Sequence, residues 1–159
     1  MKYKLLIVLC MFQVIVVSVA GQNHLKIKDI FDQYGKQEGS ILVQLSSDVL
    51  SQGSNISFYK SLIIDSNQQI EKGILEAVKS DTKNKLVVSE VKKNGKTESG
   101  SYFLGSKSSV SEFILYKDKG GKITLVYLKG NFAPDRLDNE LKKLKDLFIY
   151  VNNKRLKIQ

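Results

Sequence analysis

The chain has 159 residues, of which 42% are hydrophobic and 26% charged, and its formal net charge is +9. It holds one histidine and one cysteine, which argues against a zinc site of the usual ligand types and against a small disulfide-stapled scaffold. A chain of this length suits one domain with a sizeable core.

The chain begins with a segment typical of a secretory signal peptide. Lys2 and Lys4 precede an apolar run over Leu5–Val17, and small residues follow up to Gly21. We expect cleavage after Ala20. The competing interpretation is a membrane anchor, but the run is shorter than the roughly 20 residues that span a bilayer. Cys10 lies inside the run and would be discarded.

This interpretation divides the chain into a cleaved signal peptide, residues 1–20, and a single α+β domain, residues 21–159. The mature chain of 139 residues would contain no cysteine and would keep 23 basic and 16 acidic residues. We expect it to be exported, periplasmic or extracellular, and to touch the membrane only through the signal peptide.

The first half of the mature chain alternates helical and extended patterns. Apolar spacing predicts a helix over 25–34 and another over about 68–80, the second begun by the capping residues Asp65, Ser66 and Asn67. Runs of β-branched and aliphatic residues predict strands over 40–45, 58–64 and 86–91. Asn94-Gly95 then signals a hairpin turn, with a return strand over 99–104 that is more polar and so nearer a sheet edge.

The stretch over 110–147 is the organising unit of the predicted fold. Two strands, 113–116 and 123–128, carry apolar residues on both faces, which is typical of central strands, and Gly120-Gly121 supplies their turn. Pro134 suits the first turn of a helix. Leu137, Leu141, Leu144 and Phe148 then share one helical face. Short strands are expected over 148–151 and 154–158.

The sum of these elements predicts an α+β fold. Consecutive hairpins in the second half indicate a mainly antiparallel sheet, and about three helices packed on one face would make a two-layer sandwich. A parallel pairing across the helix over 68–80 would make the sheet mixed, and this alternative stays open.

The order of elements, the leader and the stretch 123–132 followed by a leucine-spaced helix resemble a family of small exported proteins, the domain-of-unknown-function proteins of gut Bacteroidetes. The strand 41–46, which ends in serine, and Phe113 and Tyr116 before a charged turn fit the same pattern. The resemblance implies an α+β fold and an envelope location. It implies no reaction and no functional residues.

The residues that usually carry catalysis are sparse. His24, the only histidine, sits at the edge of the predicted fold, so a catalytic dyad or triad lacks a well-held base. Glu90 and Glu112 fall in predicted strands and form the more interesting carboxylate pair, although outward edge positions explain them better. Helix dipole or solvent exposure explains Asp138 and Glu140, and capping explains Asp48 and Asp65. We therefore expect no enzyme and no catalytic, cofactor-binding or metal-binding residues.

Lysines cluster in two stretches that could bind an anion. The candidate residues are Lys92, Lys93, Lys96, Lys142, Lys143, Lys145, Lys154, Arg155 and Lys157. Arg136 and Arg155 are the only arginines, and arginine is favoured for bidentate phosphate recognition, so no specific nucleic acid is expected. A solvated lysine surface is the competing interpretation.

Three functions follow from these patterns. The leading hypothesis is an exported non-enzymatic domain that binds or assembles with a cell-envelope component, through an exposed patch that could use Tyr34, Tyr59, Tyr102 or Tyr150. The alternative is electrostatic binding of an anionic polymer or membrane surface through the lysines. The third is an enzyme that works with carboxylates alone, which requires them to converge in a pocket.

Overall fold

A computed structural model describes residues 24–50, 53–145, 148–151 and 154–157. The expected leader lies outside these ranges. The helices are α2 (Lys26–Tyr34), α3 (Ser47–Leu50), α4 (Gln68–Asp81), the 3₁₀ helix η1 (Pro134–Arg136) and α5 (Leu137–Lys145). The strands are β1 (Ile41–Ser46), β2 (Ile56–Asp65), β3 (Leu86–Lys93), β4 (Lys96–Lys107), β5 (Val110–Lys119), β6 (Lys122–Gly130), β7 (Phe148–Val151) and β8 (Lys154–Lys157).

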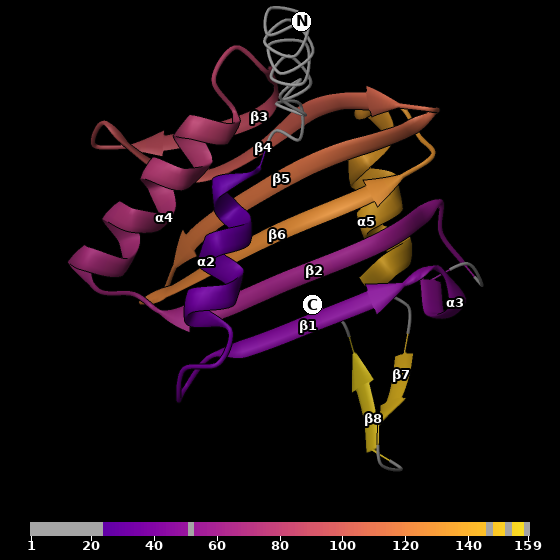
Figure 1. Ribbon diagram of the computed structural model, residues 1–159, viewed down its shortest axis with the longest axis horizontal. Coiled ribbons are helices and arrows are strands. Elements are labelled where there is room, and N and C mark those ends of the chain that lie inside the picture. Colours follow the sequence, from indigo (N-terminus) through magenta and orange to yellow (C-terminus); the bar gives the residue numbers. More distant parts are fainter. Residues whose placement is uncertain (1–23, 51–52, 146–147, 152–153, 158–159) are drawn as a thin grey trace, which may run out of the picture.

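Six strands form one antiparallel open sheet in the order β1-β2-β6-β5-β4-β3 (Figure 1). The α+β class and the mainly antiparallel sheet are thus confirmed. β2 and β3, which flank α4 in the chain, lie far apart in the sheet, so the parallel pairing left open above is absent from the described strands. β3, rather than its return strand β4, is the edge. β7 and β8 pair separately as a two-stranded hairpin.

Both predicted hairpin turns form as the residue types require. Asn94 and Gly95 have φ angles of 52° and 76°, and Gly120 and Gly121 have 62° and 74°. Positive φ at both central residues gives a turn whose twist matches that of the flanking strands. These turns fix the registers of β3 with β4 and of β5 with β6, and thereby decide which side chains face each side of the sheet.

The helices cover both faces of the sheet, so the expectation of a two-layer sandwich with helices on one face is wrong. α2 and α4 lie on one face, and α5 crosses the other (Figure 1). We name these the α2 face and the α5 face. The described residues contain four α-helices and one 3₁₀ helix, against about three helices expected.

The central strands explain why cover is needed on both faces. In β5, Phe113 belongs to the core under α5 while Ile114 belongs to the core under α2 and α4, and both are 0% exposed. Leu125 and Val126 divide in the same way in β6. Successive side chains of a strand point to opposite faces of the sheet, so a strand that is apolar throughout must be covered on both faces.

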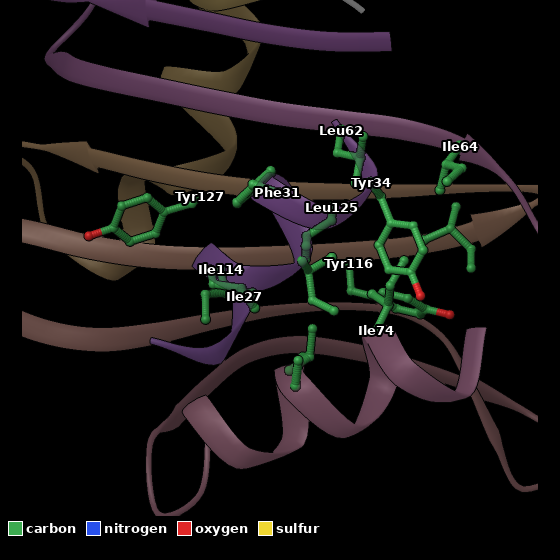
Figure 2. Close-up of a cluster of buried hydrophobic side chains, with 14 of the residues drawn as sticks. Ile27, Phe31, Tyr34, Leu62, Ile64, Ile74, Ile114, Tyr116, Leu125 and Tyr127 are labelled. Atoms are coloured by element: carbon green, nitrogen blue, oxygen red, sulfur yellow. The ribbon is translucent and has the colours of Figure 1, made fainter. Parts of the chain in front are cut away.

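The core of the α2 face joins the two long helices to the middle of the sheet. Figure 2 shows Ile27, Phe31 and Tyr34 of α2 and Ile74 of α4 directed at side chains from β2, β5 and β6. α2 has no side-chain cap of its own. Instead, the carboxylate of Asp81, at the end of α4, accepts the backbone N–H groups of Lys26 and Ile27, each at 2.9 Å. These two hydrogen bonds connect the start of α2 to the end of α4.

No helix within the described ranges is both long enough and apolar enough to cross a bilayer.

Candidate functional site

A hollow of about 340 Å³ opens on the α5 face, between α5 and the sheet. Its walls include the apolar side chains of Tyr59, Leu115, Val126 and Leu141. The exposed charged residues around it are three lysines and one acid, namely Lys117, Lys142, Lys145 and Asp138. An apolar lining with a basic margin suits a ligand that combines apolar groups with negative charge.

Apolar residues continue from this hollow to the edge of the sheet and form what we name the apolar strip. Leu86 pairs with Phe103, which pairs with Phe113 on the α5 face. Residues directly opposite one another in antiparallel strands share a face, so these side chains lie together. The strip consists of Leu86, Val88, Val91, Phe103 and Leu115.

The outer end of the apolar strip is open to solvent. Leu86 is 56% exposed and Val91 is 52% exposed, and every residue of β3 except Val88 is exposed. Register shifts interrupt the pairing of β3 with β4 at Val87/Ser89 and at Val91/Lys92. Such bulges, together with edge lysines, limit uncontrolled strand addition. The side chains of the strip are therefore a more favourable contact surface than the β3 backbone.

The tyrosines suggested for an exposed patch do not provide it. Tyr34, Tyr59 and Tyr102 are 8%, 4% and 7% exposed and belong to the two cores. The side chain of Tyr150 lies outside the described residues. Tyrosine is amphipathic, and here each described ring packs on the sheet instead of facing water. The exposed large apolar residues are instead aliphatic side chains of the two edge strands, β3 and β1, and of α3.

The structure brings some of the predicted lysines together and separates others. Lys142 and Lys145 line the hollow beside α5. Three others are engaged in ion pairs: Lys92 with Glu90 at 2.8 Å, Lys96 with Glu71 at 2.7 Å and Asp118 at 3.1 Å, and Lys143 with Glu140 at 2.8 Å. Lys93 is exposed at the end of β3. Lys154, Arg155 and Lys157 belong to β8, whose side chains are outside the described set.

Glu90 and Glu112, the carboxylate pair of interest, do not form one site. The Tyr102 hydroxyl donates to Glu90 at 2.9 Å, and the Tyr127 hydroxyl donates to Glu112 at 2.8 Å. The two carboxylates line different hollows. Hydrogen bonds from Lys92 and Tyr102 hold the pKa of Glu90 below its usual value, so it is ionised at neutral pH. Each carboxylate is thus a separate structural anchor.

Glu140 is the residue that the sequence interpretation placed wrongly. It was assigned to solvent or the helix dipole, but it is 0% exposed on the inner side of α5. Its carboxylate accepts the backbone N–H of Asn55 at 2.8 Å, the Asn55 side-chain amide at 2.9 Å and the Lys143 ammonium at 2.8 Å. Leu137, Glu140 and Leu144 are spaced i, i+3 and i+7, so the helical period could have revealed its position.

No group of three or more His, Cys, Asp and Glu side chains that could hold a metal ion occurs in the part of the chain that the structure describes. Asp65 binds Lys122 at 2.6 Å, and capping of α4 falls to Asn67, which accepts the backbone N–H of Ile70.

Comparison with protein families matches residues 14–141 to a family of unknown function, DUF6108. The chain belongs to the DUF6108 family. The match begins within the apolar run over residues 5–17 and continues through β1–β6 to Leu141 in α5. No curated protein sequence matches the chain.

Proposed function

We propose that this DUF6108 protein is exported and acts, after removal of its leader, as a non-enzymatic domain that binds a protein component of the cell envelope. The leader composition and the resemblance to exported proteins of gut Bacteroidetes support the export step. We expect protein recovered from the periplasm or medium to begin at Gly21, as read by mass spectrometry of its N-terminal peptide. A mature protein that keeps residues 1–20 would contradict this step.

The observation that carries the binding role is the apolar strip with its adjoining hollow. Leu86 and Val91 remain more than half exposed although they are large and aliphatic, whereas the residues at the inner end of the strip pack on the core. Exposed apolar side chains beside a hollow are typical of protein interaction sites in soluble proteins. It would bury additional apolar area when a partner covers it.

The charges around the hollow indicate the chemistry of the partner. Lys117, Lys142 and Lys145 outnumber Asp138, and all four are exposed. A protein segment with apolar side chains for the strip and carboxylates for the lysines would complement both features. We expect the apolar contacts to set affinity and the lysines to set orientation and rate of association.

A charge placed in the strip tests this function. Leu86→Glu would desolvate a carboxylate against the partner, so we expect at least a tenfold loss of a specific partner from pull-downs of the native envelope, quantified by mass spectrometry. Ile41→Glu is the matched control, because Ile41 is 57% exposed on the opposite edge strand, β1. Binding at the strip would be contradicted if neither variant lost a specific partner, or if both variants lost it to the same extent.

A further inference from the structure

A trough runs across the end of the sheet where α2 begins and α4 ends. It consists of two hollows of about 560 and 650 Å³ that share His24, Leu25, Leu104 and Glu112 in their walls. Because these four residues belong to both hollows, the two lie side by side. The trough lies wholly within the segment matched to DUF6108 and is separate from the hollow beside α5.

The walls of the trough are strongly basic. Five exposed lysines line it: Lys26, Lys28, Lys83, Lys85 and Lys107. None of the five forms an ion pair with a carboxylate of the described residues. This distinguishes them from Lys92, Lys96 and Lys143 of the predicted patches, whose charges are already paired.

The two carboxylates that line the trough, those of Asp81 and Glu112, both make hydrogen bonds within the fold. Asp81 accepts the first backbone N–H groups of α2. Glu112 accepts the Tyr127 hydroxyl at 2.8 Å and lies 3.3 Å from the Lys129 ammonium. Both keep their negative charge, but six lysines, the five exposed ones and Lys129, line the trough against these two acids, so the local field stays positive.

The floor of the trough is held in place by the sheet. Tyr127 packs in the core at the margin of the cluster in Figure 2, with its hydroxyl turned away from the other labelled residues. The Lys129 ammonium lies 5.6 Å from the centre of the Tyr127 ring, an arrangement that restrains this sixth cation. A ligand would thus meet a preformed base lined with mobile lysine side chains.

We propose that this trough binds a linear anionic glycan, a polymer that carries carboxylate or sulfate groups along its length. Two hollows in series fit successive units of a chain better than a single compact ligand. Lysine is a strongly hydrated point charge, so it suits repeated single anionic groups and not the planar, bidentate recognition at which arginine excels. The described walls contain no arginine, and Tyr127 is only 5% exposed, so its ring gives no platform for the base stacking that holds single-stranded nucleic acids.

The inference is independent of the proposed protein-binding strip. The trough uses charged residues at the end of the sheet where α2 begins, whereas the apolar strip uses aliphatic and aromatic residues on the α5 face, so different side chains carry the two functions. It also assigns electrostatic binding to lysines other than those that sequence clustering selected.

The test compares two triple variants with the same change in net charge. Lys26→Gln/Lys85→Gln/Lys107→Gln removes trough cations, whereas Lys36→Gln/Lys72→Gln/Lys119→Gln removes exposed cations that lie away from the trough. The probes are heparin for sulfate and polygalacturonate for carboxylate, titrated by calorimetry at 50 mM and 200 mM salt. Anionic phosphatidylglycerol vesicles form a separate arm.

We expect the trough variant to bind at least one glycan about tenfold more weakly than the parent, at roughly twofold per cation removed. We expect the control variant to stay within about twofold, and binding of the parent to fall as salt is added. Equal losses in the two variants would show a net-charge effect and overturn the site. Binding to vesicles without binding to either glycan, or no binding to any probe, would overturn it too.

Discussion

Replacing Glu140 by alanine is expected to lower the free energy of unfolding by about 3 kcal/mol. The change deletes a fully buried acceptor and leaves the backbone N–H and side-chain amide of Asn55 without the partner that satisfies them. It also releases the loop before β2 from α5. Urea denaturation followed by circular dichroism measures the effect, and a loss below about 1 kcal/mol would contradict this role.

The pH dependence of the unfolding free energy is a second test of the role of Glu140. Burial raises the pKa of the Glu140 carboxyl, but hydrogen bonds from Lys143 and Asn55 outweigh burial and hold the pKa below its ordinary value of 4.5. A carboxyl with a lower pKa when folded contributes stability at neutral pH that is lost as the pH falls below about 4.5. We therefore expect the stability difference between the wild type and Glu140→Gln to narrow on acidification. A difference in unfolding free energy that stayed constant from pH 7 to pH 3 would contradict a lowered pKa of Glu140.

Phe113→Ala is expected to cost about 3 to 5 kcal/mol of unfolding free energy. Phe113 is 0% exposed and lies at the centre of an aromatic group under α5. Its ring stacks on Phe132 with centroids 5.1 Å apart and tilts against Phe103 at 5.3 Å. Removing it leaves a cavity and also loses the aromatic contacts that join β5 to the segment before α5.

Phe113→Leu is the matched variant, because leucine keeps most of the apolar contact and loses the ring geometry. We expect it to cost less than half as much as alanine, by thermal and chemical denaturation. Equal destabilisation by both substitutions would show that ring stacking, and not filled volume, dominates at this position.

Local sequence patterns were sufficient to predict most elements of the fold. Asn94-Gly95 and Gly120-Gly121 specify turns because they adopt positive φ angles readily. Each turn makes the strands on either side of it antiparallel neighbours. Asn67 marks the start of α4 in the same local way. These features depend on residues within a few positions of one another, which is why a single sequence reveals them.

The layering could not be predicted because it depends on long-range pairing. β2 pairs with β6 across the whole of α4 and three intervening strands. This pairing decides which face of the sheet each helix meets, and no local pattern encodes it. The apolar residues on both faces of β5 and β6 were a signal that two covering layers were needed, but the strands were interpreted only as central.

The candidate sites also differ in whether their residues are close together in the sequence or only in the folded sheet. Lys142 and Lys145 were selected because they are close in sequence, and they do line one hollow. The trough lysines come from α2, from the segment after α4 and from the end of β4. Only the folded sheet brings such distant segments to one end, so clustering along the chain could not find them.

The late position of β6 in the chain has a consequence for biogenesis. β2 gains its inner neighbour only when synthesis has passed Gly130 in a chain of 159 residues. Until then, the apolar residues on both faces of β2 lack the surfaces that bury them. The strands made before β6 are therefore expected to stay loosely structured until β6 has been synthesised, a state in which holdase chaperones protect exposed apolar segments.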